Sequence, residues 1–144
     1  MVFLFRLLSL LPLSLLHALG GALGRLVYWL SPTYRRHLRE NMAQAGIDVA
    51  LRGAVAAETG KQMIELARIW MRPLDEAVPL VAEVTGWEHV EAARAAGKGI
   101  VFLTPHLGCF EITAQYLSSF GDITVLYREP KSATANELIL MGRK

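Results

Sequence analysis

The N-terminal apolar stretch limits the possible folds of this 144-residue chain more than any other feature. From Leu7 to Gly24 no side chain is formally charged, and residues 1–30 contain only two arginines, Arg6 and Arg25. Eighteen helical residues, at about 1.5 Å each, span about 27 Å, which barely matches the hydrocarbon core of a bilayer. We therefore expect residues 1–30 to form a membrane anchor helix.

How that anchor meets the membrane stays open at the level of sequence. Pro12 and His17 weaken a full span, as do the glycines at positions 20, 21 and 24. Tyr28 and Trp29 at the end of the stretch favour a helix that lies in the membrane interface. A cleaved signal peptide is the third interpretation.

Arginines are distributed unequally around the apolar stretch. Four arginines follow the uncharged stretch, namely Arg25, Arg35, Arg36 and Arg39, whereas only Arg6 precedes it. The positive-inside rule therefore predicts that the rest of the chain lies in the cytoplasm. The same arginines could contact anionic lipid head groups.

Composition agrees with membrane contact and excludes other classes. The hydrophobic fraction, 53%, is above the average for soluble proteins, and the charged fraction, 19%, is below it. A net charge of +2, without interleaved basic and aromatic residues, gives no support for nucleic-acid binding. The single cysteine, Cys109, cannot form an internal disulfide and fits a reducing compartment. The length allows one domain plus an anchor.

Residues 31–78 have the pattern of a helical segment. Ser31-Pro32 is an ordinary helix start, and Tyr34–Ala45 is expected to be helical. A second helix is predicted from Asp48 to Met71 and is ended by Pro73. An apolar stripe on this helix predicts core packing; its members are Met63, Leu66, Ala67 and Trp70.

From Pro79 onward, short apolar runs alternate with helical patterns. Strands are predicted at residues 80–85, 100–104 and 123–127, and helices at 87–96, 107–120 and 132–141. This alternation is typical of βαβ units with a mostly parallel sheet. The predicted fold class is therefore α/β: a membrane-associated helix (1–30), a helical segment (31–78), and the first half of an α/β domain (79–144).

His106 and Glu111 stand where the second predicted strand gives way to a helix. On one continuous helix they would lie about 140° apart, so they can meet only if His106 is outside the helix. Pro105 and Gly108 make such a turn plausible. Glu111 would then fix the imidazole tautomer and raise the basicity of the other ring nitrogen, so that His106 could deprotonate an alcohol. The helix N-terminus would favour a developing oxyanion, which indicates acyl or phosphoryl transfer to a hydroxyl.

Other interpretations of the same residues exist. Spacing alone favours a structural His106 that caps its helix. Cys109, three residues from His106, suggests a Cys-His pair, although an apolar-flanked cysteine is more often a small packed hydrophobe. The sequence has no His-Glu-x-x-His metal spacing, and Gly97-Lys98-Gly99 is too short for a phosphate loop.

Several blocks together resemble one family. The segment from Gly97 to Glu111 is similar to the His-x4-acid block of the lysophospholipid acyltransferase superfamily, and specifically of the lipid A late acyltransferases of Gram-negative bacteria. The apolar N-terminus agrees in order and spacing, and so do four further blocks: Arg39–Met42, Thr85–His89, Leu126–Pro130 and Gly142-Arg143. The departures are Cys109-Phe110, where the family usually has a polar residue and Trp, and Met42, where Leu is usual.

The resemblance implies acyl transfer from acyl carrier protein to a hydroxyl of a lipid A precursor, at the cytoplasmic face of the bacterial inner membrane. It implies His106 as general base and Glu111 as its orienting acid. Gly108 would allow close approach of substrate, and Arg143 would hold substrate or polarise the thioester. Arg128 is either a substrate-binding residue or a solvated arginine in a turn. No metal or cofactor is implied, because a thioester already activates the acyl group.

The resemblance covers this chain from end to end but only the first half of the family's domain, and the chain stops one residue after Arg143. Three interpretations follow. The chain is a fragment of an active lipid A acyltransferase, a glycerolipid acyltransferase of the lysophosphatidic acid type, or an inactive, truncated membrane-associated remnant.

Overall fold

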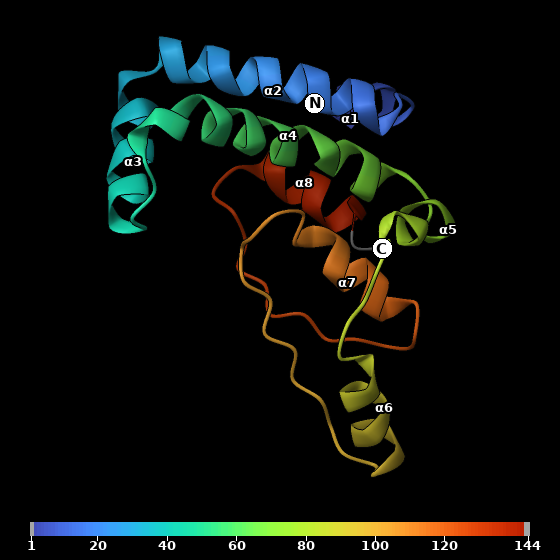
Figure 1. Ribbon diagram of the computed structural model, residues 1–144. Coiled ribbons are helices and arrows are strands. Elements are labelled where there is room, and N and C mark those ends of the chain that lie inside the picture. Colours follow the sequence, from blue (N-terminus) through green and yellow to red (C-terminus); the bar gives the residue numbers. More distant parts are fainter. Residues whose placement is uncertain (1, 143–144) are drawn as a thin grey trace. The chain divides into compact units, whose positions relative to one another are not determined.

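Helices make up all the regular structure of the part that the computed structural model describes, residues 2–142 (Figure 1). The chain divides into two units. The N-terminal unit comprises residues 1–71 and 129–144, and the middle unit comprises residues 72–128. The N-terminal unit contains α1 (Val2–Ser9), α2 (Leu13–Leu30), α3 (Pro32–Gln44), the 3-10 helix η1 (Val49–Leu51), α4 (Arg52–Met71) and α8 (Ala133–Gly142). The middle unit contains α5 (Leu74–Ala77), the 3-10 helix η2 (Val78–Leu80), α6 (Trp87–Ala95) and α7 (Glu111–Ser118).

The apolar N-terminus forms two helices because Pro12 interrupts it. The backbone N–H groups of Leu10 and Leu11 close the last turn of α1 on Leu7 and Leu8. Pro12 has no N–H to continue that ladder, and it adopts an extended conformation, with ψ at 144°, before α2 begins. Within residues 2–142, α2 is the one helix long and apolar enough to cross a membrane.

Helices α2 and α4 lie side by side with their backbones in direct contact (Figure 1). A Cβ placed on Gly20 would lie 2.6 Å from the carbonyl oxygen of Gly60, which is shorter than any real Cβ contact. A Cβ on Gly24 would collide with the carbonyl oxygen of Ala56, and one on Gly60 with that of Gly20. Only glycine permits this approach at the three positions, so the glycines determine the distance between the helices.

Helix α3 begins where the sequence predicts it. Pro32 occupies the first turn, and the Ser31 hydroxyl accepts a hydrogen bond of 3.3 Å from the backbone N–H of Tyr34. One cluster of the core joins α3 to α2 and α4; its buried members are Tyr28, Leu38, Met42 and Ala56. The start and length of α3 therefore follow from local signals, and its position follows from this cluster.

The predicted helix 48–71 is confirmed with a break at its start. The Asp48 carboxylate accepts a 2.8 Å hydrogen bond from the N–H of Ala50 and begins η1, after which α4 continues to Met71. The predicted core stripe is confirmed in part: Ala67 is fully buried, and Trp70 stacks on Phe5 with ring centroids 6.4 Å apart. Met63 is 61% exposed, so its place in the core was wrongly predicted.

An aromatic cluster organises the middle unit. The Trp87 ring on α6 lies 4.4 Å from the ring of Phe120 and 5.8 Å from that of Tyr116 on α7, centroid to centroid. Tyr116 and Phe120 also pack edge to face at 5.1 Å. Edge and tilted ring pairs at these distances are favourable beyond the area they bury, so this cluster joins α6 to α7.

The predicted parallel sheet and its βαβ units are absent from residues 2–142, and the α/β fold class is wrong for this part of the chain. Residue 80 belongs to η2, and segments 81–85, 100–104 and 123–127 are extended or irregular without ladder partners. Leu103 is 90% exposed and Leu126 is fully exposed, so the apolar runs are not covered. A strand exists only when a neighbouring strand accepts and donates its backbone hydrogen bonds, and an apolar run predicts burial without supplying that neighbour.

Candidate active site around His106

His106 occupies the middle of a tight turn in the middle unit. The N–H of Leu107 donates a 2.8 Å hydrogen bond to the carbonyl oxygen of Pro105, which closes a three-residue turn with His106 at its centre. The imidazole is exposed, and its ring centroid lies 4.3 Å from that of Phe110. Pro105 favours the turn because its φ is fixed and it cannot continue a strand ladder. His106 is therefore outside the helix and open to a substrate from solvent.

Gly108 makes the next bend. Its φ is +53°, in the left-handed region that favours glycine, and its carbonyl oxygen accepts a 3.0 Å hydrogen bond from the N–H of Phe110. Nothing lies within 4 Å of the position that a Cβ would occupy. The glycine is thus required by backbone conformation, and space beside it is free for a ligand.

Glu111 is the first residue of α7, where a carboxylate is favoured by the partial positive charge of the helix N-terminus. Helix α7 starts here, four residues later than the predicted start at 107, because residues 107–110 form the turn. Among residues 2–142, the His106 imidazole contacts the Phe110 ring and forms no side-chain hydrogen bond or ion pair. His106 and Glu111 therefore lie on the same turn-helix segment, and the pairing of their side chains stays a prediction.

The remaining predicted site residues are dispersed or not described. Arg128 is exposed in the irregular segment at the end of the middle unit. Arg143 lies outside the described residues. Cys109 is half-buried, and its thiol is free of disulfide bonding. In the described part of the chain no group of three or more His, Cys, Asp and Glu side chains could hold a metal ion.

A polar pair on the α2–α4 interface was not expected from the sequence. The imidazole of His17 lies 2.8 Å from a carboxylate oxygen of Glu65, from helices far apart in sequence. His17 had been noted only as a residue that weakens a span. The pairing depends on the contact between α2 and α4, which no local pattern predicts.

Arg52 was also overlooked. Together with Arg25, Tyr28 and Trp29 it lines a cavity of about 210 Å³ in the N-terminal unit. The basic residue itself was visible in the sequence, but its proximity to Arg25 depends on the packing of α4 against α2.

Comparison with known proteins gives one result. No curated protein and no solved structure matches the sequence significantly. The sequence model of the bacterial lipid A biosynthesis acyltransferase family matches residues 1–144, the whole chain. The resemblance read from the His106 block and its companion blocks is thereby confirmed, and the chain belongs to the bacterial lipid A biosynthesis acyltransferase family.

Proposed function

We propose that this protein transfers an acyl chain from acyl carrier protein to a hydroxyl of a lipid A precursor at the cytoplasmic face of the bacterial inner membrane. The family match over residues 1–144 is the observation that carries the proposal. The exposed position of His106 in a tight turn supports it, because a general base must be reachable by the substrate hydroxyl.

His106 is the general base of the proposed reaction. Its neutral imidazole takes the hydroxyl proton while the hydroxyl oxygen attacks the thioester carbonyl, so an ester C–O bond forms and the C–S bond breaks. The imidazolium then returns the proton to the departing thiolate of the carrier protein. No covalent acyl-enzyme intermediate is needed in this sequence of steps.

Glu111 orients and charge-balances the imidazole in the reacting complex. Catalytic hydrogen bonds are often long before substrate binds, so the hydrogen bond from His106 to Glu111 is assigned to the reacting complex. The left-handed Gly108 is the residue about which this turn bends, and it leaves room for the acceptor. Arg128 and Arg143 are assigned to substrate binding, through charge-assisted hydrogen bonds to phosphate or polarisation of the thioester.

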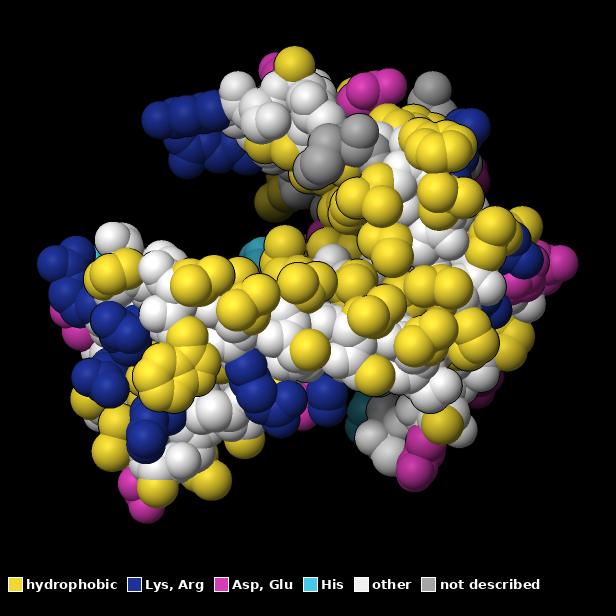
Figure 2. All heavy atoms as spheres, turned by 90° about the horizontal axis from the view of Figure 1, so that it is seen from above, with side chains coloured by type: hydrophobic (Ala, Val, Ile, Leu, Met, Phe, Trp, Pro, Cys, Tyr) yellow, Lys and Arg dark blue, Asp and Glu magenta, His cyan; other side chains and the backbone are white. Residues whose placement is uncertain are grey.

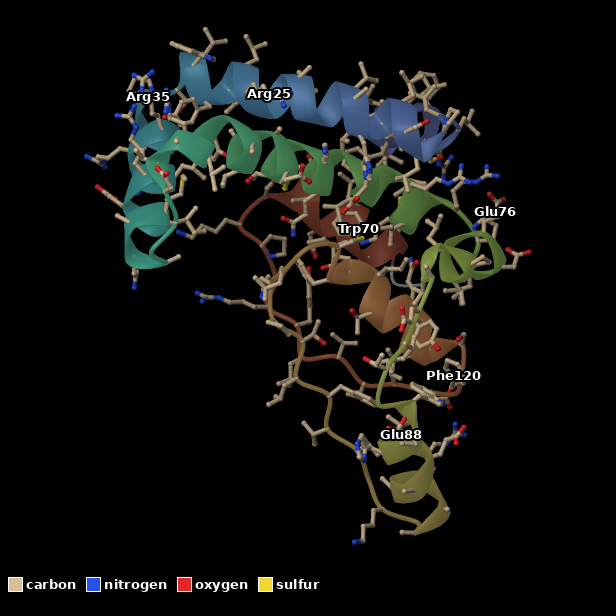
Figure 3. The ribbon with its side chains drawn as sticks, viewed as in Figure 1. Arg25, Arg35, Trp70, Glu76, Glu88 and Phe120 are labelled. Atoms are coloured by element: carbon tan, nitrogen blue, oxygen red, sulfur yellow. The ribbon has the colours of Figure 1, made fainter. Side chains whose placement is uncertain are left out.

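The inner-membrane location of the proposal is supported by the N-terminal helices. Many large apolar side chains of α1 and α2 are exposed. Arg25 lies in the C-terminal part of α2, and Arg35 lies just beyond its end (Figure 3). Under the positive-inside rule this end faces the cytoplasm.

The test is transfer of a radiolabelled acyl chain from acyl carrier protein to a lipid A precursor by the purified chain, compared with His106→Ala and Glu111→Gln. His89→Ala is the matched control, since the His89 side chain is also exposed in the middle unit, 3.9 Å from Glu88. We expect loss of turnover in His106→Ala, a strong reduction in Glu111→Gln, and wild-type rates in His89→Ala.

Each other outcome has a definite meaning. Turnover retained by His106→Ala refutes the mechanism. Acylation of lysophosphatidic acid in place of the lipid A precursor identifies a glycerolipid acyltransferase. Absence of turnover with both acceptors in the unmodified chain identifies either an inactive remnant or a fragment that needs the second half of the family's domain.

A further inference from the structure

A cavity of about 210 Å³ belongs entirely to the N-terminal unit. Residues of α2, η1 and α4 line it, among them Arg25, Tyr28, Trp29, Arg52 and Gly53. Gly53 has no side chain, and nothing lies within 4 Å of the position that its Cβ would occupy. The space beside the two arginines is therefore open to a ligand.

The two arginines of the cavity have unused hydrogen-bond donors. Arg25 donates from Nη1 to the carbonyl oxygen of Gly21 at 3.5 Å, and Arg52 donates from Nη1 to that of Val49 at 3.2 Å. Both arginines are exposed, and neither forms an ion pair in the part of the chain that the structure describes. A guanidinium presents several N–H groups in a planar fork, so most of its donors stay available here. Two such groups on one cavity suit a phosphate.

The carboxylates on the neighbouring turns have partners of their own. The Asp48 carboxylate accepts a 2.8 Å hydrogen bond from the N–H of Ala50, and the Glu58 carboxylate lies 2.7 Å from the ammonium of Lys61. Neither carboxylate lines the cavity, whose only charged lining residues are the two arginines. Figure 2 shows basic side chains gathered near the end of α2 that leads into α3. The first turn of α4 adds the partial positive charge of a helix N-terminus, so the cavity favours an anion.

Trp29 gives the cavity an exposed aromatic wall. It is 73% exposed, whereas Tyr28 is buried and its hydroxyl accepts a 3.1 Å hydrogen bond from Nε of Arg39. The Tyr28 ring is therefore held in place, and the Trp29 indole is accessible to a ligand. An indole offers a broad apolar face against which the C–H groups of a sugar ring can pack, and inorganic phosphate has no such groups. The combination of two guanidinium groups and an indole suits a phosphate that is attached to a sugar.

We propose that this cavity is a binding site for a phosphorylated sugar, with the phosphate held by Arg25 and Arg52 and the sugar ring packed on Trp29. The acceptor in the proposed function, a lipid A precursor, belongs to this ligand class, and in this respect the inference rests on the proposed function. Its readout is separate from acyl transfer, because the lining residues belong to the N-terminal unit and His106 belongs to the middle unit.

The first experiment compares four probes by isothermal titration calorimetry of the full chain in mild non-ionic detergent. The probes are glucose phosphate, glycerol phosphate, inorganic phosphate and unphosphorylated glucose. We expect glucose phosphate to bind about tenfold more tightly than glycerol phosphate or inorganic phosphate, and glucose to show no heat of binding. Equal affinity for glucose phosphate and glycerol phosphate would overturn the sugar assignment, because a phospholipid head group would then fit as well.

Variants test the two halves of the site separately. Arg25→Gln/Arg52→Gln should weaken glucose phosphate binding by about 30-fold. The control Arg6→Gln/Arg36→Gln removes the same charge from the same unit outside the cavity and should weaken it by less than about threefold. Equal losses in the two pairs would overturn the phosphate assignment. Trp29→Ala should lower the affinity for glucose phosphate to that for inorganic phosphate, and an unchanged preference for the sugar would exclude the indole.

Gly53→Leu locates the ligand without removing a charge. The leucine side chain would occupy the open space of the cavity, so we expect loss of glucose phosphate binding with the circular dichroism of the unmodified chain. Unchanged binding would place the ligand elsewhere and overturn the site.

Binding and acyl transfer fail independently. Absence of acyl transfer by a chain that binds glucose phosphate as described counts against the proposed reaction alone. Acyl transfer by a chain that binds none of the phosphorylated probes counts against the cavity alone.

Discussion

Replacing Gly24 with alanine is expected to destabilise the N-terminal unit, although alanine is the better helix former. The added methyl would collide with the carbonyl oxygen of Ala56 on α4, so the two helices must move apart by about 1 Å or more to restore an ordinary contact. Overpacking of this kind costs about 1–3 kcal/mol, and separation also weakens the neighbouring Gly20–Gly60 contact. After a gain of about 1 kcal/mol in helix propensity, we expect a net loss of about 1 kcal/mol.

Gly53 provides the matched control. It also lies within a helix, near the start of α4, but nothing lies within 4 Å of the position of its missing Cβ. Gly53→Ala is therefore expected to stabilise the protein by about 0.5–1 kcal/mol, which is the propensity gain without the collision.

The assay is reversible unfolding by guanidinium in mild detergent, followed by far-ultraviolet circular dichroism. The midpoint should fall for Gly24→Ala and rise for Gly53→Ala, with the slope unchanged in both. Equal midpoints for the two variants would show that α2 and α4 are not held at backbone contact.

Three further predictions concern single residues. Ser31→Ala removes the hydroxyl that caps α3 at the N–H of Tyr34 and should cost about 1 kcal/mol in the same unfolding assay, whereas Ser31→Asn should restore most of it. The hydrogen bond from Lys61 lowers the pKa of Glu58 below its ordinary value, so the stability this group contributes is present above the ordinary carboxyl pKa and is lost as pH falls through the lowered one. In the pH range between the ordinary and the lowered carboxyl pKa, the unfolding midpoint should fall less steeply with acid in Glu58→Gln than in the unmodified protein. An equally steep fall in both proteins would show that Glu58 does not contribute to stability. Gly108→Ala forces an alanine into a left-handed conformation at a cost of about 1 kcal/mol. We expect lower acyl transfer and a thermal midpoint lower by a few degrees, and full activity would show that the turn tolerates a side chain.

Local signals in the sequence predicted local structure well. Ser31-Pro32 correctly indicated the start of α3, and Pro73 follows the end of α4 at Met71. The placement of His106 outside the helix, inferred from Pro105 and Gly108, is also confirmed. Each of these depends on the conformational preferences of neighbouring residues, which are encoded in the segment itself.

The features that were missed depend on distant partners. The strand predicted at 100–104 has the right residue types, yet a strand requires a neighbour, and residues 2–142 supply none. In the sequence Gly20 and Gly24 indicate weak points of a membrane span, whereas in the structure they allow α4 to reach the backbone of α2. The pairing of His106 with Glu111 stays a prediction, because spacing alone does not determine the conformation of the turn between them.

The backbone contact between α2 and α4 also bears on the order of synthesis. Gly24 and Gly60 are 36 residues apart in the sequence, so at roughly 5–20 residues per second the ribosome makes α2 about 2 to 7 s before its partner position on α4 exists. During that interval both faces of α2 lack a partner, and a targeting factor or chaperone that covers apolar helices can bind the nascent chain. Once α4 has been made, it covers the glycine face of α2.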